Sequence, residues 1–237
     1  MTQSKTLREH KNDILSCSKE EVKLAARLHK KQPLFSMPAL FANSLSYSVI
    51  TVAIEALFST KTLGYYSVST RLLGMPLSLI SGNVSRIYME EASNEYARTG
   101  GYRKAFRKSF LFLLTLAILM VLVMYFLAPP ICELLFGSGW YVAGVYIKIL
   151  AVMFGIRFIA TAMSQSLSIC EKQQYELFIQ IFLVAAALLS SLLTIIFDYT
   201  IEQFLLCVCI LKSIGFVLDI AVVYYFSKPR KKSNVIQ

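Results

Sequence analysis

The chain has 237 residues, a formal net charge of +10 and a hydrophobic content of 56%. Soluble domains average about 45–50% apolar residues on a similar count, so the long apolar runs here indicate a polytopic membrane protein. The basic residues cluster between those runs, as they do in the cytoplasmic loops of membrane proteins, and the charge therefore does not indicate nucleic-acid binding.

The residue types that carry chemistry show no catalytic arrangement. The five cysteines have neither metal-ligand spacing nor, being odd in number, a paired disulfide pattern. His10 and His29 lie in the polar N-terminal segment, away from any acid–base partner set. There is no nucleotide-binding loop and no nucleophile–base set. The sequence therefore predicts no enzyme, no metal site and no cofactor.

Residues 1–31 form a polar segment that carries eight Lys and Arg residues. Ser18 and Glu21 have the spacing of a capping box, which predicts a short helix, and Lys19, Lys23 and Arg27 would share one face of it. We expect a cytoplasmic basic linker with a short amphipathic helix. That helix lies on anionic lipid in one interpretation and is a solvated linker in the other. No cleavable signal peptide is visible.

Six apolar runs follow, each near or above the roughly 20 residues that cross a bilayer core. We expect an all-α membrane unit over residues 32–227 and a basic cytoplasmic tail over residues 228–237. The expected spans are residues 33–58, 64–88, 110–128, 141–168, 177–197 and 204–226. Between them we expect a charged loop over residues 90–109, broken by Gly100 and Gly101, and a re-entrant turn after Pro129 and Pro130, which should end the third span.

Loop charges predict the orientation of these spans. Most of the 24 Lys and Arg residues fall on the side that carries both termini, whereas Lys61 is the one basic residue of the opposite loops. The positive-inside rule then places both termini in the cytoplasm.

Charged residues inside the expected spans are the candidates for function, because a central charge costs about 2.5–3.5 kcal/mol on insertion scales. Arg71 and Arg157 are expected to bind anions, since guanidinium groups bind phosphates well. Lys212 and Asp219 are seven residues apart, and two interpretations stay open: a structural pair, as a salt link or as snorkelling side chains, or a functional role. Glu55 is either a proton- or ion-coupling group or a partner for Arg71 or Lys148.

Two segments resemble the seventh and eighth helices of bacterial polysaccharide (O-antigen type) flippases: PLFSMPALFANSLSYSV and GYYSVSTRLLGMPLSLISGNVSRIYMEEAS. A later pair, LLFGSGWYVAG and IKILAVMFGIRFI, is similar to the turn into the tenth helix of that family. The family belongs to the multidrug/oligosaccharidyl-lipid/polysaccharide exporter superfamily. The resemblance runs from about Pro33 to the end of the chain, and the preceding basic segment resembles the central cytoplasmic linker of the family.

The resemblance implies a V-shaped transporter of two six-helix lobes in the bacterial inner membrane. It would flip undecaprenyl-diphosphate-linked sugars by alternating access, in the synthesis of O-antigen and lipopolysaccharide. This chain resembles the C-terminal lobe alone, so we expect as partners a missing N-terminal lobe or a second copy, besides membrane lipids. A fragment, a split gene product and a half-transporter all remain open.

The resemblance also assigns roles. Arg71 matches the arginine within the eighth-helix pattern, whereas Arg157, Lys148 and Glu55 are chosen by depth and charge. Arg71, Arg157 and Lys148 would offer positive charge to the diphosphate. Pro76 would permit its helix to bend between the inward and outward states. The residues expected to contact sugar are Asn43, Tyr47 and Asn83. The alternatives are a non-transporting remnant or membrane partner subunit, and a drug/cation exporter. The last is disfavoured, because the spans hold four basic and two acidic residues.

Overall fold

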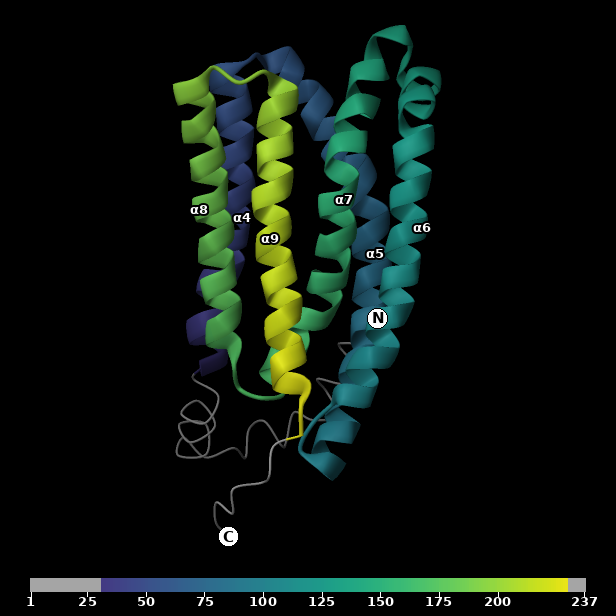
Figure 1. The fold of residues 1–237 in the computed structure, drawn as a ribbon, viewed down its shortest axis with the longest axis vertical. Coiled ribbons are helices and arrows are strands. Elements are labelled where there is room, and N and C mark those ends of the chain that lie inside the picture. The colour runs from purple at the N-terminus through teal and green to yellow at the C-terminus, as the bar shows by residue number, and fades with distance from the viewer. Residues whose placement is uncertain (1–30, 230–237) are drawn as a thin grey trace, which may run out of the picture.

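The computed structural model describes residues 31–229, which are helical with no strand in this part of the chain, as the sequence predicts (Figure 1). The predicted N-terminal amphipathic helix and most of the basic tail lie outside the described residues. The helices are α4 (Lys31–Leu57), α5 (Thr60–Thr99), α6 (Arg103–Phe136), η1 (Ser138–Trp140), α7 (Tyr141–Ser164), η2 (Gln165–Ser168), α8 (Gln173–Phe197) and α9 (Ile201–Ser227).

Five of the long helices in the described part are long and apolar enough to cross a membrane: α4, α6, α7 with η2, α8 and α9. Their outward faces expose large apolar side chains, for example Phe112, Leu119 and Phe126 on α6. Apolar surface of this extent is unfavourable in water and is the surface that lipid tails cover. The chain is therefore a polytopic all-α membrane protein.

Helix α5 differs from the other five. It has 40 residues and contains the expected span 64–88, but it falls outside the set that is apolar enough to cross by composition. The reason is visible in its sequence, since Ser, Thr and Gly residues and Arg71 interrupt the leucines, and its second half is charged. The crossing of the membrane by residues 64–88 stays a prediction.

The predicted charged loop over residues 90–109 is wrong. α5 continues to Thr99, and α6 begins at Arg103. Gly100 ends α5 in the left-handed conformation, with φ 72° and its N–H bonded to the Tyr96 carbonyl. The carboxylate of Glu95 then accepts hydrogen bonds from the backbone N–H groups of Lys104 (3.1 Å) and Ala105 (2.8 Å), which satisfies free donors at the start of α6. The charges thus lie on helical extensions.

This α5–α6 corner rests on the C-terminal end of α9. The Tyr102 N–H donates to the Ser227 carbonyl at 2.9 Å. Gly101 lies so close to Pro229 that an added Cβ would come within 2.5 Å of the proline nitrogen. The Tyr102 side chain is buried, and burial raises the pKa of its hydroxyl above the usual range. The hydroxyl donates to the Val223 carbonyl at 3.4 Å.

The prediction that Pro129 and Pro130 end the third span is also wrong, since α6 continues through both to Phe136. Gly144 of α7 approaches this point so closely that an added Cβ would lie 2.2 Å from the Pro129 Cα. The two prolines have no N–H to donate, so α6 lacks two helical hydrogen bonds here. The close contact with α7 makes their loss tolerable. The expected re-entrant turn reduces to a bend at Gly137 (φ 96°) and the short helix η1.

Two helices extend beyond the N-terminal end of their expected spans: α8 begins at Gln173, before the span 177–197, and α9 begins at Ile201, before the span 204–226. For α9 the cause is a capping box. The Thr200 hydroxyl accepts from the Gln203 N–H, and the Gln203 side chain accepts from the Thr200 N–H.

The long helices pack in two groups, α4–α8–α9 and α5–α6–α7, and α7 joins the groups by packing on α5, α6 and α9 (Figure 1). Lipid tails are as apolar as the helix surfaces, so the hydrophobic effect does not drive helices together inside a membrane. Close packing and interhelical hydrogen bonds hold them together instead. The Ser69 hydroxyl of α5 donates to the Ala143 carbonyl of α7 at 2.8 Å, and the Ser46 hydroxyl of α4 donates to the Leu183 carbonyl of α8 at 3.3 Å. The central position of α7 places Arg157 inside the bundle.

Candidate functional site

Two cations meet one aromatic ring at the junction of α4, α7 and α9. The Lys212 ammonium of α9 lies 3.8 Å from the centroid of the Tyr47 ring of α4, and the Arg157 guanidinium carbon of α7 lies 4.6 Å from it. Arg157 also lies 5.4 Å from the Phe154 ring. A cation over an aromatic face is attracted by the ring quadrupole. We refer to Tyr47, Arg157 and Lys212 as the Tyr47 cluster.

The Tyr47 cluster carries positive charge without a compensating anion among residues 31–229. Lys212 is 0% exposed. Among the described residues its ammonium has no hydrogen-bond partner, nor has the Tyr47 hydroxyl, and neither cation forms an ion pair. An unpaired charge away from water is costly, and the two cations repel each other. The ring offsets part of this cost, so the cluster is a place where an anionic group would be stabilised.

Arg157 also borders a small cavity between α5 and α7. The cavity has a volume of about 60 Å³ and includes Gly74, Ser78 and Ser81 of α5 in its lining. These residues flank Pro76, whose missing N–H leaves one carbonyl of the preceding turn without its helical bond. The serine hydroxyls donate to backbone carbonyls of α5 itself, Ser78 to Met75 and Ser81 to Ser78. Arg157 is therefore the residue that joins the Tyr47 cluster to the polar wall of α5.

The interpretation of Lys212 and Asp219 as a salt link or as snorkelling side chains is wrong. Both are buried, at 0% and 5% exposure, and no ion pair joins them within residues 31–229. Seven residues place them two turns apart, about 10 Å along the helix axis. Lys212 instead extends to Tyr47, and the Asp219 carboxylate keeps one oxygen without a hydrogen bond among the described residues.

Of the predicted site residues, the structure brings Tyr47 and Arg157 together. Asn43 lies one turn before Tyr47 on α4 and is half-buried. Lys148 lies elsewhere on α7, 5.4 Å from the Tyr125 ring of α6. Glu55 is exposed and forms no ion pair with Arg71 or Lys148.

The two predicted residues of α5 lie outside this cluster. Arg71 is exposed and makes no hydrogen bond, ion pair or ring contact with the residues that the structure describes. Asn83 is exposed, and its side-chain amide donates to the Leu79 carbonyl of the same helix at 3.0 Å. Arg71 and Ser78 are seven residues apart and therefore share one face of α5. The arginine thus belongs to a surface of this chain rather than to its interior.

Lys212 is the member of the cluster that is not among the predicted site residues. Its position near the middle of an apolar helix was a signal, because a lysine there cannot reach water as one near a helix end can. Within the described residues no group of His, Cys, Asp and Glu side chains could hold a metal ion.

Residues 14–145 match the model of a family described as polysaccharide biosynthesis protein. The match covers more than half of the chain and includes Tyr47 and Arg71, but it ends before Arg157 and Lys212. Comparison with the curated proteins and with the solved structures finds no match.

Proposed function

The chain belongs to the family of polysaccharide biosynthesis proteins, and from this membership and the Tyr47 cluster we propose that it is one half of a lipid-linked oligosaccharide flippase. It moves undecaprenyl-diphosphate-linked sugar units across the bacterial inner membrane by alternating access, with both of its termini in the cytoplasm. The diphosphate is the part of the substrate that the cationic cluster holds.

The observation that carries this proposal is the pair of cations on the Tyr47 ring. A diphosphate has several negatively charged oxygens, and Arg is well suited to bind them by two parallel hydrogen bonds. A buried ammonium without a partner gains most from such an anion, because the surrounding medium screens the attraction weakly. Exporters of cationic drugs would favour acidic groups at this place, so the charge of the cluster supports an anionic substrate.

A second half supplies the other wall of the translocation path in this proposal. Arg71 and Asn83 are exposed on α5, and an exposed arginine at membrane depth is costly in contact with lipid. A six-helix N-terminal lobe or a second copy of the chain would cover them. Pro76 lies between these two residues and lowers the resistance of α5 to bending, which supports its role as the hinge.

The test replaces the chromosomal gene with Arg157→Gln in the organism that carries it. The matched control is Arg86→Gln, which removes the same charge from an exposed position of α5. At equal protein levels, Arg157→Gln should lower surface polysaccharide about tenfold or more, as expected for one lost charged hydrogen bond. The lipid-linked oligosaccharide should accumulate on the cytoplasmic face, and the control should behave as wild type.

The same measurement distinguishes the other functions. An impaired enzyme that makes the lipid-linked oligosaccharide would leave less of it, and an impaired enzyme that consumes it after export would let it accumulate on the outer face instead of the cytoplasmic face. A non-transporting remnant would leave both quantities unchanged even when the whole gene is deleted. Each of these results overturns the flippase proposal.

A further inference from the structure

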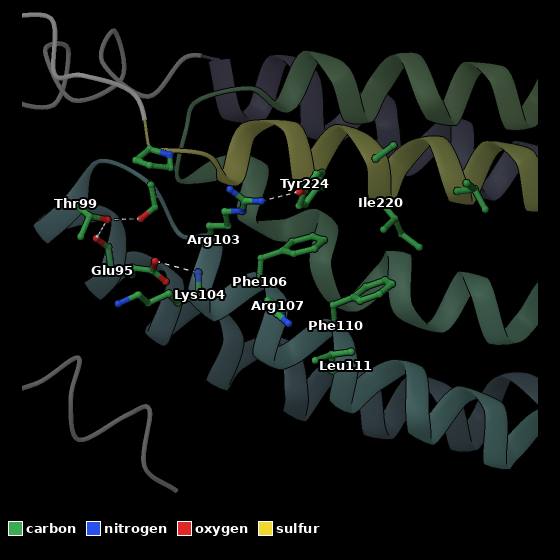
Figure 2. A pocket seen from close by; sticks show the side chains of 14 residues that line it. Glu95, Thr99, Arg103, Lys104, Phe106, Arg107, Phe110, Leu111, Ile220 and Tyr224 are labelled. Atoms are coloured by element: carbon green, nitrogen blue, oxygen red, sulfur yellow. Dashed lines mark hydrogen bonds between the residues drawn. The ribbon is translucent and has the colours of Figure 1, made fainter.

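A groove with a volume of about 950 Å³ lies between α6 and α9, next to the α5–α6 corner (Figure 2). Its volume is at the upper end of the range of about 300–1,000 Å³ that is typical of small-molecule sites. One end of the groove is basic and the remainder is apolar. It shares no lining residue with the Tyr47 cluster, so it is a separate feature of the fold.

Three cations line the basic end: Arg103, Lys104 and Arg107. The Arg103 guanidinium donates to the Tyr224 hydroxyl of α9 at 3.0 Å, so this side chain already reaches across the groove. A guanidinium has five N–H donors, and most of them remain available to a ligand. Glu95 is the one carboxylate among the described lining residues, and its two oxygens accept hydrogen bonds from the N–H groups that begin α6. Three cations outnumber this carboxylate among the described lining residues, so the basic end has a net positive charge.

The apolar part is built from aromatic and aliphatic side chains on both helices. Phe106 and Phe110 stack with their ring centroids 5.7 Å apart, and Phe106 lies 5.4 Å from the Tyr224 ring. Figure 2 shows these two phenylalanines on α6, with Ile220 and Tyr224 on α9. An anion without an apolar part would leave these aromatic and aliphatic side chains uncovered. A ligand that also has a hydrocarbon chain would bury them.

The two ends of the groove suit a ligand with an anionic head and an apolar tail, and the position of the groove along α6 indicates which ligand of this kind fits. The basic residues precede the apolar run of α6, which begins at Phe110, so they lie where a helix enters the headgroup layer. Basic pockets between transmembrane helices at this depth bind anionic lipid headgroups. Among the lining residues within 31–229 there is no amide side chain of the kind that binds sugar.

We propose that the groove binds one anionic phospholipid of the surrounding membrane. The phosphate contacts Arg103 and Arg107, and an acyl chain lies along Phe106, Phe110 and Ile220. The lipid bridges α6 and α9, two helices that otherwise have few direct contacts. This assignment is independent of the flippase proposal, because it concerns lipid binding by the purified chain and no transport step.

The test measures lipid binding to the purified full chain in detergent by native mass spectrometry. Phosphatidylglycerol and phosphatidylcholine with identical acyl chains are the two probes. We expect phosphatidylglycerol to bind at least fivefold more tightly, since each basic residue near a lipid surface contributes about 1 kcal/mol. Equal binding of the two lipids would overturn the proposal.

Single-charge variants locate the site. Arg107→Gln should weaken phosphatidylglycerol binding about fivefold on the same estimate, whereas Arg98→Gln, in the last turn of α5 and outside this groove, should change it less than twofold. Equal effects of the two variants would assign the preference to the general charge of the corner and would overturn the groove as the site.

A third variant tests the apolar part. Ile220→Trp adds bulk inside the groove, and it should weaken binding of long-chain phosphatidylglycerol more than that of a short-chain form. If chain length makes no difference in the wild type, the proposed path of the acyl chain is wrong. A polyprenyl phosphate that displaces phosphatidylglycerol at a tenfold lower concentration would assign the groove to a transport substrate instead.

Discussion

The Lys212 ammonium and the Arg157 guanidinium share the ring of Tyr47, although the three residues belong to helices far apart in the chain. The ring therefore has two effects: it links α4 to α7 and α9, and it keeps two like charges close without an anion among the described residues. Each effect leads to a separate prediction.

The first prediction concerns the ring. Tyr47→Leu removes the aromatic face and should destabilise the protein by about 2 kcal/mol, the value for a desolvated cation–π contact. For a chain of this size that corresponds to a fall in Tm of roughly 4–8 °C. Tyr47→Phe keeps the face and loses a hydroxyl that has no hydrogen-bond partner among the described residues, so its Tm should stay near wild type. Thermal unfolding in detergent measures both, and equal losses would refute the role of the ring.

The second prediction concerns the buried ammonium. Lys212→Met replaces an unpaired charge by an apolar side chain of similar length, and such replacements are often neutral or stabilising by about 1–4 kcal/mol. We expect an unchanged or higher Tm together with a loss of surface polysaccharide. A variant that is both less stable and less active would show instead that Lys212 supports the fold.

The third prediction tests the contact between α6 and α7. Gly144→Ala forces a Cβ against the Pro129 backbone, and it should cost about 1–3 kcal/mol, as overpacking does. Gly64→Ala is the control, because no atom of the described residues lies within 4 Å of an added Cβ there, and alanine favours a helix over glycine by up to about 1 kcal/mol. The two variants should therefore shift Tm in opposite directions.

The fourth prediction tests the cap on α6. Glu95→Ala removes the acceptor of the Lys104 and Ala105 N–H groups and should cost about 0.5–2 kcal/mol, the range for a lost helix cap. Hydrogen exchange of the first turn of α6 should become faster. Glu90→Ala, at an exposed position of α5, serves as the comparison, and equal exchange in both variants would refute the cap.

The sequence predicted the helices well and several of their ends poorly, for one physical reason. Apolar runs show which residues meet lipid, but a helix also continues into water when its backbone bonds are satisfied. The charged residues after Glu90 therefore predict a loop broken at Gly100, whereas α5 continues through them to Thr99 and is capped by Gly100. Pro129 and Pro130 were interpreted as a stop because the compensating approach of Gly144 belongs to another helix.

For the candidate site, the sequence indicates individual residues but not which of them lie together. Tyr47 and Arg157 could be named because polar side chains within apolar helices are unusual. Their proximity to Lys212 could not be predicted, since spacing along α9 carries no information about which face of α4 lies opposite. The position of Arg71 also depends on tertiary contacts, and the structure places it on the surface of this chain.

The close approach of Gly144 to Pro129 also limits how this protein can move. Where backbone meets backbone there are no intervening side chains to change rotamer, so α6 and α7 have little freedom to slide at that end. The α6–α7 hairpin should therefore move as one unit at that end, and any large rearrangement of the bundle must be absorbed at other helix contacts, such as those of Tyr47 between α4, α7 and α9.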